Sequence, residues 1–254
     1  MTIANEEVPQ NNKNFGNTRD NWRKEMAASI TLRDKAIELT VLSNEFNYGY
    51  QWEWCGVPII RHPDDIVLQQ EIVWSLKPSH IIETGVARGG SLVLSHSLIG
   101  MTGIPGKVLG LDIKILPHTI ENLKPWLEDK GIQIFECDSA KDIAKQHVTS
   151  FLNDNQRPVL VVLDSNHTEN HVLNELNCIA PLLPAGSIII IADTIIEEMP
   201  EDYYPDRPWG IGNNPLTALN KFLQSNHNYK RDDRWSRRSL MGEFRDGIIY
   251  KLAT

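Results

Sequence analysis

The chain has 254 residues, of which 41% are hydrophobic and 23% charged, as in one large globular domain with or without an appended cap. Its net charge of −8 argues against a general affinity for nucleic acid, and its longest apolar runs are too short to span a membrane. The start lacks a secretory signal pattern, and three widely spaced cysteines form no disulfide framework. We therefore expect a soluble, cytoplasmic protein with neither nucleic-acid nor membrane partners.

The N-terminal part is predicted to precede the main domain. Residues 1 to about 18 are polar and rich in Asn, which is typical of a mobile tail. From Thr18 to about Asn44, apolar residues recur with helical spacing and predict one or two amphipathic helices. The aromatic segment 47–65 has no clear period and forms either a cap packed on the core or a wall of a substrate site. We assign residues 1–60 to a disordered tail and a helical cap or lid.

Residues 61–254 are predicted to form an α/β domain. A helix begins at Asp64 or Asp65 and ends before Pro78. Strands and helices then alternate, and the strands are runs of Ile, Val and Leu, as in a doubly wound, mostly parallel sheet covered on both faces. The predicted strands are residues 79–84, 107–112, 132–138, 158–165 and 187–193, with helices at 91–99, 119–130, 140–152 and 169–183.

The C-terminal segment does not continue the regular alternation of strands and helices. Residues 214–233 predict a helix that leads into an edge strand, and residues 247–253 predict a last strand that pairs with it in antiparallel orientation. Four arginines lie between these strands or at their edges, interleaved with acidic residues. They form either a mixed charged surface or a local anion-binding patch: Arg231, Arg234, Arg237 and Arg238, next to Asp232 and Asp233.

A glycine-rich turn, residues 83–91, follows the first strand of the main domain. Its sequence, Glu-Thr-Gly-Val-Ala-Arg-Gly-Gly-Ser, is neither the Gly-x-Gly-x-x-Gly pattern of dinucleotide-binding folds nor a P-loop. Gly85 and Gly89 allow a ligand to approach the backbone closely, and Glu83 at the strand end can interact with a cationic group. The alternative is a tight turn that binds no ligand.

The next two strands also end in polar residues. Asp112 is placed to accept the hydroxyls of a ribose, and Asp138 with Ser139 is placed near an adenine amino group. A cofactor with an adenosine part and a cationic amino-acid part, but no phosphate, satisfies these positions together with Glu83. S-adenosylmethionine has those parts.

This arrangement of residues resembles a known family. Glu-x-Gly-x-x-x-Gly-Gly, the strand-end Asp and "CDS" are similar to class I S-adenosylmethionine-dependent methyltransferases. "QEIVWSLKPSHIIETGVARGGSLVLSHSLIG", "VLGLDIK", "VLDSNHT", "IIIIADT" and "NPLTALNKFL" resemble the group named cephalosporin hydroxylase-like, from about Tyr48 to the C-terminus. The resemblance implies a seven-stranded Rossmann-like sheet with an antiparallel C-terminal strand, and relatives that methylate sugars and macrolides. It implies these cofactor-binding residues: Glu83, Gly85, Arg88, Gly89, Ser91, Asp112, Asp138 and Ser139.

Two further aspartates end neighbouring strands and predict a metal site. Asp164 and Asp193 lie at the carboxyl ends of parallel strands, where two close anions favour a cation such as Mg²⁺ between them. Relatives have an acidic residue just before the second aspartate or an Asn just after it, but this chain has Ala192 and Thr194. Thr194, Glu197 or Glu198 completes the metal shell, or the metal is absent and the aspartates cap the segments that follow them.

His167 follows Asp164 by three residues, at the position similar to the general-base lysine of catechol O-methyltransferase. The resemblance implies that His167 is the catalytic base, beside the catalytic Asp164. His171 is a second candidate for the base, and the alternative is that His167 is only a polar surface residue. The Pro- and Tyr-rich segment 197–215 is either a substrate lid, with Tyr203, Tyr204 and Trp209 against the substrate, or a structural excursion.

The predicted function is Mg²⁺-assisted methyl transfer from S-adenosylmethionine to a hydroxyl of a small molecule, such as a sugar, a glycosylated natural product or a saccharide precursor. One alternative is a hydroxylase, although no 2-His-1-carboxylate iron set is visible in the sequence. Another is a non-catalytic cofactor-binding subunit, which Ala192 favours. The resemblance also implies a possible homo-oligomer.

Overall fold

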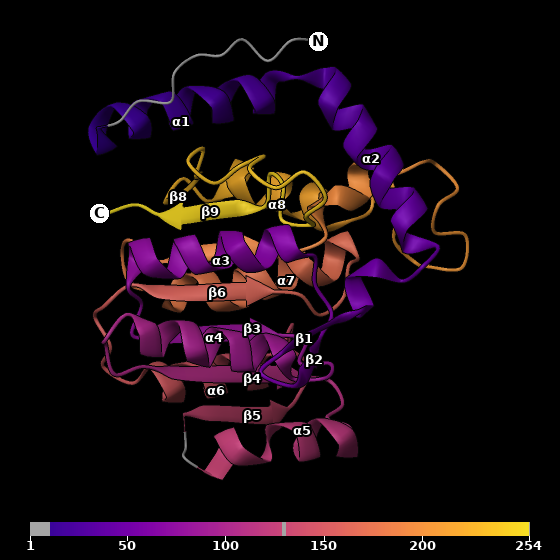
Figure 1. Cartoon of the computed structure of the whole chain (residues 1–254). Helices are drawn as coiled ribbons and strands as arrows, with labels where there is room; N and C mark the ends of the chain where they lie inside the picture. Colours follow the sequence, from indigo (N-terminus) through magenta and orange to yellow (C-terminus); the bar gives the residue numbers. More distant parts are fainter. Residues whose placement is uncertain (1–10, 129–130, 254) are drawn as a thin grey trace.

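A computed structural model describes residues 11–128 and 131–253, and its centre is a seven-stranded sheet of order β5-β4-β3-β6-β7-β9-β8 (Figure 1). Strand β9 pairs in antiparallel orientation with both β7 and β8, whereas β3 to β7 pair in parallel. This confirms the predicted fold. The strands span His80–Thr84 (β3), Lys107–Asp112 (β4), Ile132–Glu136 (β5), Val159–Leu163 (β6), Ile188–Ile191 (β7), Tyr229–Arg231 (β8) and Ile248–Lys251 (β9).

Helices cover both faces of the sheet, as predicted. Ile81 and Ile82 in β3 show why, since neighbouring side chains in a strand point to opposite faces and each joins a separate buried cluster. One face carries α3 (Pro63–Leu76) and α4 (Gly90–Met101), and α5 (Pro117–Glu128) lies beside β5; the other face carries α6 (Asp142–Leu152), α7 (Glu169–Ile179) and α8 (Pro215–Ser225) (Figure 1). The end of the predicted helix 119–130 lies outside the described residues.

The N-terminal helices differ from the prediction. Helix α1 (Asn12–Ala28) begins well before Thr18, because the Asn11 side chain accepts hydrogen bonds from the backbone N–H groups of Lys13 and Asn14. The predicted tail is therefore wrong from residue 12 onward, and residues 1–10 lie outside the described part. Helix α1 buries no residue, and Ile30 and Leu42 of α2 (Ile30–Asn44) are 74% and 56% exposed. The apolar side expected for these helices is therefore only partly covered.

The aromatic segment forms regular structure that the sequence pattern did not predict. After the 3₁₀ turn η1 (Tyr48–Tyr50), strands β1 (Trp52–Trp54) and β2 (Val57–Ile59) form an antiparallel hairpin. Its two connecting residues, Cys55 and Gly56, have positive φ, as tight hairpin turns require. The hairpin packs on α4, where the Trp54 indole donates a 2.9 Å hydrogen bond to the Ser97 hydroxyl. It therefore covers the helix that follows the glycine-rich turn.

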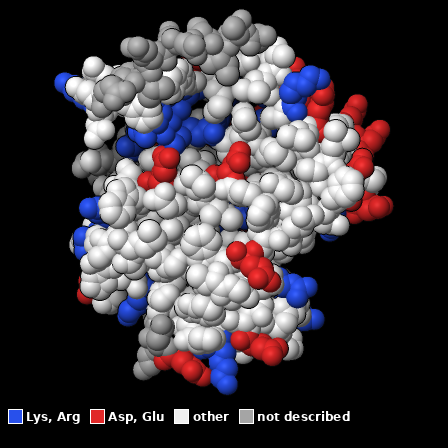
Figure 2. All heavy atoms as spheres, in the orientation of Figure 1, with Lys and Arg blue, Asp and Glu red and all other residues white. Residues whose placement is uncertain are grey.

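The four C-terminal arginines have nearby acceptors, which favours the mixed charged surface over an anion-binding patch. Arg234 pairs with Asp232 at 2.6 Å, Arg237 pairs with Asp246 at 2.9 Å, and Arg238 pairs with Glu71 of α3. Arg231 donates to the Asn220 side chain at 2.6 Å. Figure 2 shows basic and acidic side chains together on this face, below α1. Within the described residues, no helix has the length and apolar character needed to cross a membrane.

Candidate active site

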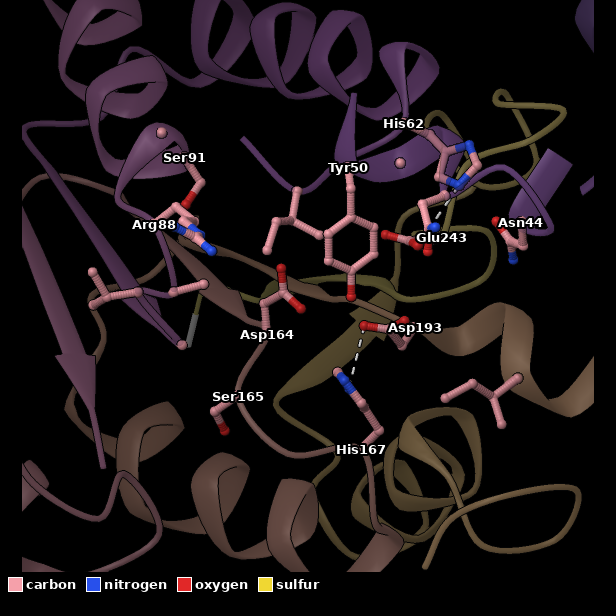
Figure 3. A pocket seen from close by; sticks show the side chains of 18 of the residues that line it. Asn44, Tyr50, His62, Arg88, Ser91, Asp164, Ser165, His167, Asp193 and Glu243 are labelled. Atoms are coloured by element: carbon pink, nitrogen blue, oxygen red, sulfur yellow. Dashed lines mark ion pairs between the residues drawn. The ribbon is translucent and has the colours of Figure 1, made fainter. Parts of the chain in front are cut away.

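A cavity of about 440 Å³ lies at the carboxyl ends of β3, β6 and β7, within the range of small-molecule sites (Figure 3). The hairpin segment, the glycine-rich turn and the segment after β7 all contribute to its walls. The lining residues are Asn44, Asn47, Gly49, Tyr50, Pro58, Ile60, His62, residues 85–91, Asp164, Ser165, His167, Asp193, Ile196, Tyr203, Tyr204, Arg207, Trp209 and Glu243. The segment 47–65 thus supplies a wall of this cavity, in line with one of the two predictions for it.

The glycine-rich turn presents its backbone to the cavity. Gly85 has φ of +86°, and a Cβ there would lie 1.9 Å from the backbone oxygen of Asp164. Gly89 has φ of +92° and caps α4. The turn therefore needs glycine for its conformation and for its close contact with the end of β6. Without side chains at these two positions, the turn leaves room beside its backbone for a bulky ligand.

Replacing Gly85 by Ala is expected to destabilise the protein by about 2 kcal/mol or more, because the new Cβ meets backbone that cannot move aside. For a chain of this size this corresponds to a Tm lower by roughly 4–8 °C, which thermal unfolding measures. Gly103→Ala is the matched control, since Gly103 also has positive φ, +72°, but no atom lies within 4 Å of its added Cβ. Equal losses in the two variants would show that φ alone, and not the contact with Asp164, requires glycine.

The predicted cofactor residues fall into two groups. Gly85, Arg88, Gly89 and Ser91 line the cavity. The other four do not belong to its described lining: Glu83, Asp112, Asp138 and Ser139.

Three of these four polar residues organise backbone or neighbouring side chains. Asp112 accepts hydrogen bonds from the N–H groups of Val86 (2.7 Å) and Ala87 (3.2 Å), so it fixes the backbone of the glycine-rich turn. Asp138 accepts from the N–H of Ala140, and the Ser139 hydroxyl lies 3.3 Å from His171 Nε2. The predicted ribose and adenine contacts of Asp112, Asp138 and Ser139 stay predictions.

Glu83 is fully buried and is not among the residues that line the cavity. Its carboxylate accepts a hydrogen bond from the Ser91 hydroxyl and lies 3.9 Å from Arg61 Nη2. Burial raises the pKa of Glu83, and Arg61 opposes that shift. Glu83 therefore supports the turn from the protein interior, and its predicted contact with the cationic group of a cofactor stays a prediction.

Asp164, His167 and Asp193 form a group of candidate metal ligands. One ligand atom from each lies within 4.8 Å of the others, and His167 Nδ1 is 3.2 Å from Asp193 Oδ2 (Figure 3). Asp164 directly follows β6 and Asp193 follows β7 after Ala192, and these neighbouring strands bring the two aspartates together as predicted. Asp193 adopts the left-handed region, with φ of +56°, which aspartate tolerates better than most residues.

The three residues proposed to complete the metal shell are engaged elsewhere. Thr194 is buried, and its hydroxyl donates to the backbone oxygen of Glu243 at 3.1 Å, so its role as a metal ligand stays a prediction. Glu197 accepts from the N–H of Gly212 at 2.8 Å. Glu198 pairs with Arg33 and Arg245, both at 2.8 Å. None of the three belongs to the described lining of the cavity.

The electrostatics of the cavity fit a bound cation. Burial and the charge of Asp193 raise the pKa of Asp164 well above its usual range, while Arg61 opposes the shift. Burial and Asp193 also raise the pKa of Glu243. Carboxylates that repel one another in a closed space favour a divalent cation, and Mg²⁺ prefers such oxygen ligands. The described residues contain no group with the two histidines and one carboxylate of an iron hydroxylase.

Sequence reasoning missed three side chains at this site. Tyr50 extends over the cavity toward the two aspartates, and Glu243 faces it from the loop between β8 and β9 (Figure 3). Arg61 lies 3.1 Å from Asp164 through Nη2. Tyr50 and Arg61 belong to the segment 47–65, which was predicted as a possible wall of the site. Nothing in the sequence indicates that Glu243 lies near Asp193.

The predicted substrate residues lie together on one wall. Tyr203, Tyr204 and Trp209 all line the cavity, and the Trp209 ring stands edge-on to His167 with centroids 4.8 Å apart. The Arg207 guanidinium lies 5.3 Å from the centre of the Trp209 ring. Aromatic rings beside carboxylates are suited to a sugar or a flat acceptor.

Comparisons with known proteins place the chain in a family. The profile of the family described as "Rhamnosyl O-methyltransferase/CmcI" matches residues 46–252. The chain is 30% identical over 181 residues to the rhamnosyl O-methyltransferase of Mycobacterium tuberculosis (strain ATCC 25618 / H37Rv), covering 70% of this chain and 69% of the relative. It is 29% identical over 161 residues to the enzyme of the same name from Mycobacterium leprae (strain TN), covering 62% and 68%.

A solved structure described as "cmcI-D160 Mg-SAM" shares the fold, with a TM-score of 0.54 and 21% identity over 80% of this chain and 78% of that one. The family match confirms the predicted resemblance and the predicted enzyme class, an S-adenosylmethionine-dependent methyltransferase. The chain belongs to the rhamnosyl O-methyltransferase/CmcI family.

Proposed function

We propose that this protein transfers a methyl group from S-adenosylmethionine to a hydroxyl of a sugar, with Mg²⁺ held by Asp164 and Asp193. The observation that carries this proposal is the closely spaced group of Asp164, His167 and Asp193 beside the glycine-rich turn. The names of the curated relatives support a rhamnosyl group, or a similar deoxysugar on a larger molecule, as the acceptor.

Each part of the cavity has a role in this proposal. The backbone of residues 85–91 would hold the cofactor, which supplies an electrophilic methyl group when bound. Mg²⁺, when bound, would make an acceptor hydroxyl more acidic. Tyr203, Tyr204 and Trp209 would hold the acceptor against the aspartates, and this orientation supplies much of the rate.

His167 would accept the proton of the acceptor hydroxyl. Its Nδ1 lies against Asp193, which leaves Nε2 as the atom that takes the proton, while the Trp209 ring fixes the plane of the imidazole. Asp193 would then serve both the metal and the histidine through its two oxygens.

The test is a titration followed by a methyl-transfer assay. Calorimetry with S-adenosylhomocysteine, with and without Mg²⁺, measures cofactor binding, and radiolabelled S-adenosylmethionine measures transfer to a panel of rhamnosides, other sugars and catechols. We expect transfer to rhamnosides, loss of activity in EDTA and recovery on addition of Mg²⁺. Binding of the cofactor with transfer that EDTA does not affect would contradict the metal role, and no cofactor binding would contradict the whole assignment.

Three further predictions remain to be tested. A cytoplasmic location is compatible with the three free cysteines. A homo-oligomer and a division of the chain at residue 60 are the others, although the family match already begins at residue 46. Chromatography with light scattering and limited proteolysis would test them.

A further inference from the structure

Arg61 is a buried cation whose position neither the fold nor the proposed chemistry requires. It follows strand β2, and its side chain is 1% exposed. Its Nη2 lies 3.1 Å from Asp164 Oδ2 and 3.9 Å from Glu83 Oε1. A buried charge is retained when partners of opposite charge surround it, and here one partner lies in β3 and the other directly after β6.

The guanidinium is fixed on its other sides as well. Nη1 donates to Gln69 Oε1 at 2.5 Å, and Gln69 Nε2 donates to the Ser95 hydroxyl at 2.9 Å. The Phe244 ring centre lies 5.1 Å from the Arg61 Cζ. Gln69 of α3, which Ser95 of α4 holds in turn, and Phe244 of the C-terminal loop therefore orient the guanidinium.

The two carboxylates that flank Arg61 belong to different halves of the cavity. Glu83 accepts the hydroxyl of Ser91, which lines the cavity in the glycine-rich turn. Asp164 belongs to the candidate metal ligands. A continuous chain of polar contacts, Ser91–Glu83–Arg61–Asp164, thus joins the cofactor side to the metal side. Because Arg61 occupies Asp164 Oδ2, the other oxygen remains for the cavity.

We propose that Arg61 is a positioning residue, which orients Asp164 for the metal and couples metal binding to occupation of the glycine-rich turn. This inference rests on the proposed function. A cofactor that packs on Ser91 fixes Glu83, and Glu83 fixes Arg61 and thereby Asp164. By thermodynamic linkage the metal then tightens cofactor binding by the same factor.

The test measures the affinity for Mn²⁺ alone by electron paramagnetic resonance, with and without S-adenosylhomocysteine. In the unmodified protein we expect the cofactor product to tighten Mn²⁺ binding by about fivefold or more. Arg61→Lys keeps the charge but loses the planar fork, so it should weaken Mn²⁺ binding about 10–100-fold and remove the coupling. Glu83→Gln should leave Mn²⁺ binding within about threefold and also remove the coupling.

Arg157→Lys is the matched control, because Arg157 is exposed, does not line the cavity and precedes the amino end of β6, whereas the cavity lies at its carboxyl end. A folded Arg61→Lys protein that binds Mn²⁺ like the control would overturn the positioning role. A Glu83→Gln protein in which S-adenosylhomocysteine still tightens Mn²⁺ binding would overturn the proposed coupling through Glu83. This variant tests the coupling even if Arg61→Lys does not fold. Absence of Mn²⁺ binding in the unmodified protein would instead contradict the proposed function, so the two failures are distinguishable.

Discussion

Replacing Asp164 by Asn is expected to lower kcat/KM for methyl transfer by about 10³-fold, equivalent to roughly 4 kcal/mol of transition-state stabilisation. Asp164 is the one residue that belongs both to the candidate metal group and to the buried ion pair with Arg61. An amide keeps the shape of the side chain but loses the charge that attracts the metal. Steady-state rates at saturating Mg²⁺ measure the effect.

The metal dependence separates this effect from misfolding. The variant should keep its affinity for S-adenosylhomocysteine within about tenfold. Its apparent Kd for Mg²⁺ should rise by at least about 10–100-fold, the loss that usually follows when a residue that supports a metal ligand is replaced. Asp154→Asn is the control, since Asp154 is exposed and does not line the cavity. An Asp164→Asn enzyme with unchanged Mg²⁺ affinity would show that the carboxylate does not bind the metal.

The residues at the strand ends were predictable because the apolar runs in the sequence show where each parallel strand ends. Runs of Ile and Val locate β6 and β7, so the residues after them, Asp164 and Asp193, must meet at the same edge. Two neighbouring parallel strands therefore predict a site without any knowledge of packing. The glycine-rich turn was predictable for a similar reason, because Gly85 is required by a backbone contact and not by a distant side chain.

Contacts that cross between distant segments were not predictable. Glu243 reaches the cavity because its N–H donates to Asp65 at 2.6 Å and its carbonyl accepts from Thr194, two contacts set by tertiary packing. Thr194 was predicted as a metal ligand since it adjoins Asp193, but its hydroxyl is engaged by the backbone oxygen of Glu243, a residue far along the chain. Helix α1 was missed over its first residues because the cap at Asn11 lies in a polar stretch.

Replacing His167 by Gln is expected to lower kcat by about 10²–10⁴-fold, the usual contribution of a general base. Gln can still accept a hydrogen bond but cannot take up the proton of the acceptor hydroxyl. KM for the acceptor should change little, since the rings of Tyr203, Tyr204 and Trp209 remain in place. Single-turnover rates with a rhamnoside acceptor measure this loss directly.

His171 supplies the control, because it was the rival base. Its Nε2 lies 3.1 Å from the Ser165 hydroxyl and 3.5 Å from Glu175 Oε1, and the hydrogen bond to Glu175 raises its pKa. His171 does not line the cavity and its Nε2 is engaged by these neighbours, so His171→Gln should change kcat by less than about tenfold.

The same pair of variants decides whether His167 is a base or a metal ligand. Mg²⁺ prefers oxygen donors, so His167→Gln should leave the affinity for Mg²⁺ within about threefold, and the loss should appear in kcat. A large fall in metal affinity would instead assign the imidazole to the metal. Because His167 Nδ1 already lies 3.2 Å from Asp193, we expect the carboxylate to hold the metal and to orient the histidine at the same time.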